Sequence, residues 1–522
     1  MNYYDYSNYG AYGAGVYQAP VQPARAQNLY KPDKTDFVFA ITVFVLGYLF
    51  SRWVLFTWVG WGVAAFTTAY LLTVSLYLIK KDAFVNTGAT WFWLAATWAT
   101  GISYAMWENM GFAPVRALFL FCAAVYFVLA ASGRLFKGKT GNYMLIDGIN
   151  AVILIPFRNF LNQYVSFSVL RKGEKRGKVL PVLLGVLLAL LLLIGIVPLL
   201  ERADSGGFSM ILRFIQDLLK IDFFEVLIYG FFAIPVAAYL YGLVSGAAHR
   251  KGTDIIRQEP TQETVKSLRI LHPATVFVML GTVCGLYLVF ILCQAPYFFS
   301  AFTGKRPEGW LVYSEYARRG FFELCGISVI NLIVMTISNL TCVKPRAESR
   351  LLKAFNIALS LITLLLIATA FSKMAIYIDA YGLTMPRLLP CLFMVFLALV
   401  FIALTALQKW DFSIVRFALI SGAVMLCALC LSNPDAAVVR YNTERFVSGT
   451  LAEYDVDILR RAGTAGVGPA LEVYARLEEG DPLKHCIYEY LCEISYVVLS
   501  IGDNAQSVES YQAKTRLDAF SR

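Results

Sequence analysis

Charged residues stand at the mouth of an apolar segment in the second half of the chain, where they could bind an anion. Arg318, Arg319 and Glu323 lie at the start of a long apolar run. A charge buried in a bilayer costs about 2.5–3.5 kcal/mol on insertion scales, so each of these groups needs a partner, water or a route to the surface. Arg319 and Glu323 are four residues apart, which lets them pair on one face of a helix.

A second polar segment, residues 372–387, follows in the sequence. Gly382 can end a helix there, and the residues around it carry both charges and tyrosines. One interpretation is a solvated turn with interfacial tyrosines. The other is a shared outward-facing site in which the arginines contact an anionic group and the two carboxylates orient them. The predicted binding set is Arg318, Arg319, Glu323, Tyr377, Asp379, Tyr381 and Arg387.

The sequence predicts no catalytic residue, no metal site and no cofactor. Its three histidines are His249, His272 and His485, which are scattered and form no metal-ligand motif. Ser245 and His249 could meet on a helix, but no orienting carboxylate is evident from the sequence. Residues 133–140 fit the phosphate-loop pattern GxxxxGK[ST], yet they follow an apolar run instead of a strand, so a basic loop is favoured.

The composition indicates an integral membrane protein. Of the 522 residues, 58% are hydrophobic and only 15% are charged, whereas soluble domains carry about 25% charged residues. The net charge of +10 comes from Lys and Arg in short clusters between apolar runs. That pattern is typical of membrane topology and argues against nucleic-acid binding.

Eleven apolar runs are long enough, or nearly so, to cross a bilayer as helices. The predicted fold class is therefore all-α, a polytopic transmembrane helical bundle. The predicted spans are 37–53, 55–79, 88–107, 114–132, 179–200, 223–248, 273–295, 320–342, 351–372, 387–407 and 413–431. Residues 143–157 are apolar but short and contain polar residues, which favours an interfacial or re-entrant segment.

Changes in composition divide the chain into three parts. Residues 1–35 are rich in Tyr, Gly and Ala without periodicity, and are predicted to be a disordered tail. Residues 36–431 form the transmembrane domain. Residues 432–522 contain many acidic residues and helical periodicity, and are predicted to be a small soluble helical domain.

Lys and Arg are concentrated in the even-numbered connections between spans, which predicts that those connections and the amino terminus are cytoplasmic. Eleven crossings would then place the carboxyl-terminal domain outside. The predicted location is the bacterial cytoplasmic membrane, which the chain crosses several times.

Three blocks, YSEYARRGFFEL (313–324), YIDAYGLTMPR (377–387) and NPDAAVVRYNTER (433–445), together resemble an uncharacterised bacterial family of multi-pass membrane proteins, the domain of unknown function designated four-one-seven-three. The resemblance implies a polytopic membrane fold and no established activity. Lys373 departs from the family pattern, in which an arginine is usual, and so does Pro386, which replaces an aliphatic residue.

These observations predict a non-enzymatic binding or transport component with an outward-facing polar site. Besides the lipid bilayer, its partner would be a small anionic ligand, a lipid headgroup or a membrane protein. The alternative is a structural or regulatory partner of an envelope or signalling complex, with the charged motifs holding the helices in register.

Overall fold

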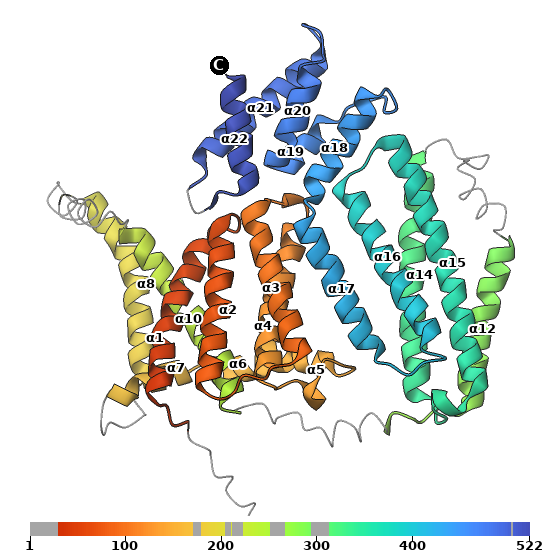
Figure 1. Cartoon of the computed structure of the whole chain (residues 1–522), viewed down its shortest axis with the longest axis horizontal. Helices are drawn as coiled ribbons and strands as arrows, with labels where there is room; N and C mark the ends of the chain where they lie inside the picture. The colour runs from red at the N-terminus through yellow and green to blue at the C-terminus, as the bar shows by residue number, and fades with distance from the viewer. Residues whose placement is uncertain are drawn as a thin grey trace, which may run out of the picture.

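The protein is all-α, as predicted. The computed structural model describes residues 30–170, 179–203, 210, 223–250, 267–293, 313–502 and 505–521. Each predicted span corresponds to one long helix, and these helices lie side by side (Figure 1). They are α1 (Lys34–Phe50), α2 (Trp61–Lys80), α3 (Gly88–Met106), α4 (Ala113–Ala131), α8 (Val179–Ala203), α10 (Phe223–Ala248), α12 (Pro273–Cys293), α14 (Tyr313–Thr341), α15 (Arg350–Tyr381), α16 (Met385–Ala406) and α17 (Ile414–Leu431).

Nine helices in the described part of the chain are long and apolar enough to cross a membrane. Of the helices named above, only α3 and α8 are outside this set; α8 contributes a shorter apolar stretch, Leu184–Leu200. Many large apolar side chains of the nine membrane-spanning candidates face outward. Examples are Leu72, Leu118 and Leu286, which are at least 60% exposed. Such a surface suits lipid, because hydrocarbon tails are as apolar as these side chains.

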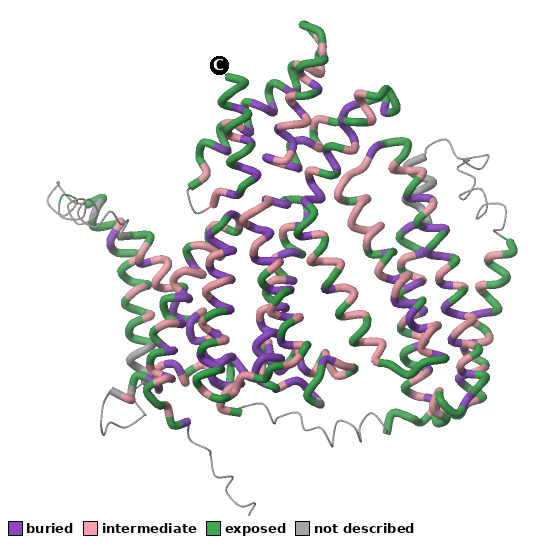
Figure 2. Tube along the Cα trace, in the orientation of Figure 1, coloured by how far each residue is buried: buried purple, intermediate pink, exposed green. Residues whose placement is uncertain are grey.

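The long helices form two bundles with separate apolar cores. The first core is built mainly from α1, α2, α3, α4 and α10, and the second from α12, α14, α15 and α16. Helix α17 lies between the bundles and packs against α3 and α16. Figure 2 shows buried residues concentrated inside each bundle, with exposed residues along the outer faces.

Small residues allow close helix approach in the first bundle. Gly242 and Gly246 are four residues apart on α10, and a Cβ atom at either position would collide with the Pro156 carbonyl or with Asn159. The other GxxxG pair is less crowded: a Cβ atom added at Gly281 would make only ordinary contact with Phe355, and one added at Gly285 would meet open space. Only the first pair therefore acts as a helix-packing motif.

The short apolar segment after α4 does not cross the bundle. It forms α5 (Met144–Ile149), a π-helical turn over Asn150–Leu154, α6 (Ile155–Arg158) and α7 (Asn162–Ser166). These pieces lie at the same end of the bundle as the start of α1 (Figure 1).

The carboxyl-terminal helices form a domain at the opposite end of the bundle from the start of α1 (Figure 1). They surround a third apolar core that includes Leu459, Tyr490 and Leu491. The helices are α18 (Pro434–Val447), α19 (Val456–Ala462), the 3₁₀ turn η8 (Gly463–Gly466), α20 (Val467–Tyr474), α21 (Pro482–Ser500) and α22 (Val508–Phe520).

Candidate functional site

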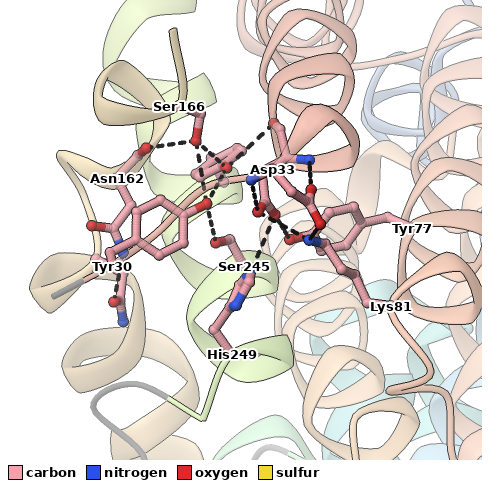
Figure 3. Close-up of polar contacts among 11 residues, drawn as sticks. Tyr30, Asp33, Tyr77, Lys81, Asn162, Ser166, Ser245 and His249 are labelled. Atoms are coloured by element: carbon pink, nitrogen blue, oxygen red, sulfur yellow. Dashed lines mark hydrogen bonds and ion pairs between the residues drawn. The ribbon is translucent and has the colours of Figure 1, made fainter. Parts of the chain in front are cut away.

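Two buried polar clusters lie at opposite ends of the structure. The first, here called the α1 clasp, surrounds the start of α1 and comprises Tyr30, Asp33, Asp36, Tyr77, Lys81, Ser166, Tyr241, Ser245 and His249 (Figure 3). The second, here called the α18 junction, joins the carboxyl-terminal domain to both bundles. It comprises Glu108, Gly111, Asp379, Leu383, Asn433, Asp435, Asn442, Arg445 and Glu509.

The carboxylate of Asp36 is the centre of the α1 clasp. Asp33 caps α1, and the two aspartates form a reciprocal capping box, which places Asp36 in the first helical turn. Asp36 is fully buried, and its carboxylate accepts hydrogen bonds from the Tyr77 hydroxyl at 2.6 Å and the Lys81 ammonium at 2.9 Å. His249 Nε2 lies 3.0 Å from the same carboxylate. A buried carboxylate needs such partners, because the loss of its hydration would otherwise make the charged form too unfavourable in the folded protein.

Hydroxyl groups extend the clasp toward α7 and α10. The Tyr30 hydroxyl lies 2.6 Å from that of Tyr241 on α10, and the Tyr241 hydroxyl lies 2.5 Å from the Ser166 hydroxyl on α7. Tyr30 falls in the range predicted as a disordered tail, yet it is only 6% exposed. The clasp therefore ties the start of α1 to three other helices.

The clasp contains the carboxylate that sequence reasoning did not find for Ser245 and His249. Asp36 faces the histidine, although 213 residues separate them. The Ser245 hydroxyl, however, donates to Tyr30 at 3.4 Å and is fully buried. A hydrolytic serine must be reached by substrate, so this arrangement supports a structural role.

The α18 junction begins with hydrogen bonds at the amino end of α18. Asn433 has a left-handed conformation with φ 49°; its side chain caps α18 and donates to Glu509 on α22 at 2.7 Å. Glu509 also accepts the backbone N–H of Glu108, at 3.0 Å. Asp435 accepts the backbone N–H of Gly111 at 3.0 Å. The end of the first bundle is thus bonded to two helices of the carboxyl-terminal domain.

Burial makes this part of the junction sensitive to protons. Asp435 is 2% exposed, and its burial raises the pKa of its carboxyl group to about 6, against the opposing effect of the Gly111 hydrogen bond. Burial also raises the pKa of Glu108, and the nearby Glu509 carboxylate adds to that rise. Arg116 is fully buried beneath them and donates to the carbonyls of Trp107 and Glu108.

The carboxyl end of α18 is bonded to the second bundle. The Asn442 side chain both accepts from the Leu383 N–H at 2.7 Å and donates to the Leu383 carbonyl at 2.6 Å. Arg445 forms an ion pair with Asp379 at 3.3 Å and donates to the Asp379 carbonyl at 2.8 Å. Two of the three sequence blocks named above therefore contact each other directly.

Residues of α18 other than those bonded to the bundles line a groove of about 1000 Å³ in the carboxyl-terminal domain. Its walls come from α18, α20 and α22, and Trp107 lies at the membrane-facing end. Two arginines, Arg440 and Arg516, contribute to it from different helices. The remaining side chains are mostly small or acidic: Ser432, Asn433, Ala436, Ala437, Thr443, Glu444, Thr464, Ala465, Gly468, Pro469, Leu471, Glu472, Glu509, Gln512 and Ala513.

The structure brings together part of the binding set predicted from the sequence. Arg387 lies 4.1 Å from the ring centre of Tyr377, and it donates to the carbonyls of Tyr381 and Gly382 at the end of α15. The carboxylate of Asp379 pairs with Arg445, which was not in the predicted set.

The rest of the predicted set lies on α14. Glu323 is exposed there. Arg318 and Arg319 are in the first turns of α14, and their side chains lie outside the described residues. Whether the whole set binds an anion stays a prediction.

Among the described residues, no group of three or more His, Cys, Asp or Glu side chains could hold a metal ion. The two clusters above contain carboxylates, but these are bonded to backbone amides, hydroxyls and cations of the protein itself.

The fold and the apolar helices define an integral membrane protein with a docked carboxyl-terminal helical domain. The chain belongs to the family described as a domain of unknown function, DUF4153, whose model matches residues 94–473. The prediction of an uncharacterised family is confirmed, but the predicted number, four-one-seven-three, was wrong. Short motifs can resemble more than one family, whereas this match covers α4 to η8 and most of α3 and α20. No curated protein and no solved structure matches the chain.

Sequence reasoning missed Asp36, Glu108, Asp435 and Glu509 as members of clusters. A signal existed for Asp36, since two aspartates three residues apart before an apolar run can form a capping box. Glu108 and Glu509 are 401 residues apart, and no local pattern predicts that they meet.

Proposed function

We propose that this protein is a non-enzymatic binding component of the cell membrane, which receives a small anionic ligand in the groove of its carboxyl-terminal domain. The observation that carries the proposal is the double role of α18. One face of the helix lines the groove, and other residues of the helix bond Gly111 of the first bundle and Leu383 of the second. A ligand that shifts α18 would therefore act on both bundles.

The arginines support an anionic ligand. Arg516 has no hydrogen-bond or ion-pair partner within the described part of the chain, and its guanidinium group lies over Gly468, where a side chain would collide with it. Arg440 pairs with Glu444 at 2.7 Å, but both side chains are more than 60% exposed, so this pair can open at little cost. A guanidinium group can bind a carboxylate or phosphate through two hydrogen bonds.

Binding can be tested with the full chain in lipid nanodiscs, with inorganic phosphate and succinate as probes. We expect one of them to raise the melting temperature and to bind in calorimetric titration. Arg516→Ala should weaken that binding by about tenfold or more, because a charge-assisted hydrogen bond contributes about 1.5–3 kcal/mol.

The matched control is Arg460→Ala. Arg460 belongs to the same domain and pairs with Glu493 at 3.1 Å, outside the groove. Its substitution should leave binding unchanged. If neither probe binds, or if both variants lose binding equally, the groove is not an anion site.

The topology is part of the proposal, with the carboxyl-terminal domain outside and the amino terminus in the cytoplasm. Lys80 ends α2, Arg134 follows α4, and Lys344 and Arg346 lie between α14 and α15. These helix ends are at the end of the bundle where α1 starts (Figure 1), which is the end that the positive-inside rule places in the cytoplasm.

Cysteine labelling tests this orientation. Cys486 and Cys492 are exposed on the carboxyl-terminal domain. In a Cys122→Ser/Cys293→Ser background, which removes the other exposed cysteines, a membrane-impermeant maleimide should label Cys486 and Cys492 in intact cells, and the further Cys486→Ser/Cys492→Ser variant should lose that label. Labelling only after the cells are opened would place the domain in the cytoplasm.

A structural or regulatory partner role is the second candidate, and the ion pair between Arg445 and Asp379 favours it. This ion pair holds the carboxyl-terminal domain against the second bundle, beside the hydrogen bonds of Asn442. Under this alternative, Arg445→Ala would release the domain and abolish association with a partner, while phosphate and succinate would not bind the wild-type protein.

A further inference from the structure

Ala505 and Gln506, between α21 and α22, attach the carboxyl-terminal domain to the start of α2. The Trp61 N–H donates to the carbonyl of Gln506 at 2.9 Å. Gly60 has a φ of +88°, and the Ala505 backbone occupies the space that a side chain at Gly60 would need. The start of α22 is therefore held at the level where α2 begins.

Large apolar side chains are exposed at this edge of the domain. Tyr496, Val497 and Leu499 in the last turns of α21 are 77%, 48% and 64% exposed. Val508 and Tyr511 in the first turns of α22 are 50% and 65% exposed. We call these five residues the apolar edge. Soluble proteins rarely leave such a group uncovered.

Aromatic residues of the bundle mark the membrane surface beside the apolar edge. Phe56 and Trp58 lie between α1 and α2, and Trp61 begins α2; each of the three is more than 40% exposed. Exposed tryptophans at the ends of apolar helices are typical of the headgroup layer of a bilayer, which extends about 6 Å beyond the hydrocarbon on each side. Tyr496 is four residues before the end of α21, or about 6 Å along the helix.

We infer that the apolar edge rests in the headgroup layer of the membrane, so that the carboxyl-terminal domain is bound to lipid as well as to the helix bundles. The occupant of this surface is phospholipid. Two tyrosines and three aliphatic side chains match that layer, because tyrosine has an apolar ring and a polar hydroxyl that remains hydrated. The inference requires only that the bundle spans a bilayer, and it holds whichever face of the membrane the domain occupies.

Photocrosslinking in nanodiscs of phosphatidylcholine and phosphatidylglycerol tests the inference with the full chain. p-Benzoylphenylalanine replaces Tyr496 or Tyr511, and mass spectrometry then detects phospholipid attached to the corresponding peptide. The matched control is the same replacement at Tyr488, which is 47% exposed on the same helix. Tyr488 is eight residues farther from the loop, or about 12 Å along the helix, and therefore lies farther from the membrane surface.

We expect lipid adducts at Tyr496 and Tyr511 and only background at Tyr488, with all three variants retaining the wild-type melting temperature. Absence of adducts at Tyr496 and Tyr511 in folded protein would overturn the inference. So would equal adducts at all three positions, which indicate random collision with lipid. Crosslinks to a second copy of the chain in place of lipid would also overturn it, by showing that protein covers the edge.

Discussion

Protonation of Asp435 should tighten the attachment of the carboxyl-terminal domain to the first bundle. Its pKa rises from an ordinary value of 3.8 to about 6 in the folded protein. A carboxyl group with a raised pKa destabilises the folded state when it is charged, so this penalty is fully present above about pH 6 and disappears as the pH falls toward 3.8. The complete shift corresponds to about 3 kcal/mol.

Between pH 7 and pH 5 the same linkage predicts a roughly tenfold smaller undocked population, which is a gain of about 1–2 kcal/mol in the free energy of docking. Hydrogen exchange in the peptide that contains Gly111 measures this population, because the Gly111 N–H donates to Asp435 only in the docked state. After correction for the intrinsic pH dependence of exchange, protection should rise about tenfold on acidification. Burial raises the pKa of Glu108 as well, so its contribution has the same sign.

The variants separate these contributions. Asp435→Asn should lose most of the pH dependence, and the double variant with Glu108→Gln should lose the remainder. Asp518→Asn is the control, since Asp518 is an exposed carboxylate of the same domain and should leave the wild-type response intact. Protection that falls on acidification, or a full response in the double variant, would refute the assignment to these carboxyl groups.

Two further predictions use matched pairs of residues. Gly382→Ala should lower the free energy of unfolding by about 2 kcal/mol or more, because Gly382 has a φ of +78° and its new methyl group would collide with the Asn442 side chain. Gly449 has a φ of +74° but open space around it, so Gly449→Ala should lower the free energy of unfolding by less. Lys81→Met should lower the free energy of unfolding by about 3 kcal/mol, because it removes a cation from the buried carboxylate of Asp36 in the α1 clasp. Lys80 is exposed, so Lys80→Met should change the free energy of unfolding by less than about 0.5 kcal/mol. Thermal or denaturant unfolding in detergent measures both pairs, and equal effects within either pair would contradict the corresponding contact.

Several features of the fold could be predicted from the sequence alone. The predicted spans and the long helices agree in order, and the segment after α4, which the sequence predicts not to cross, forms only short helices. Transfer of a helix into lipid depends on the composition of about 20 consecutive residues, which is a local property. The predicted division of the chain at residue 432 rests on a similar local change in composition and stays a prediction.

The candidate sites depended on contacts that no local pattern encodes. Asp379 was expected to orient Arg387, but the fold places its carboxylate against Arg445, 66 residues later. Glu108 and Glu509 meet across 401 residues.

The sequence by itself determined that this is an all-helical membrane protein, because the transfer of each segment into lipid is set by its own residues. The tertiary structure alone decided which buried polar groups satisfy one another, since each hydrogen bond and ion pair requires a distance and a direction that only the packed helices provide.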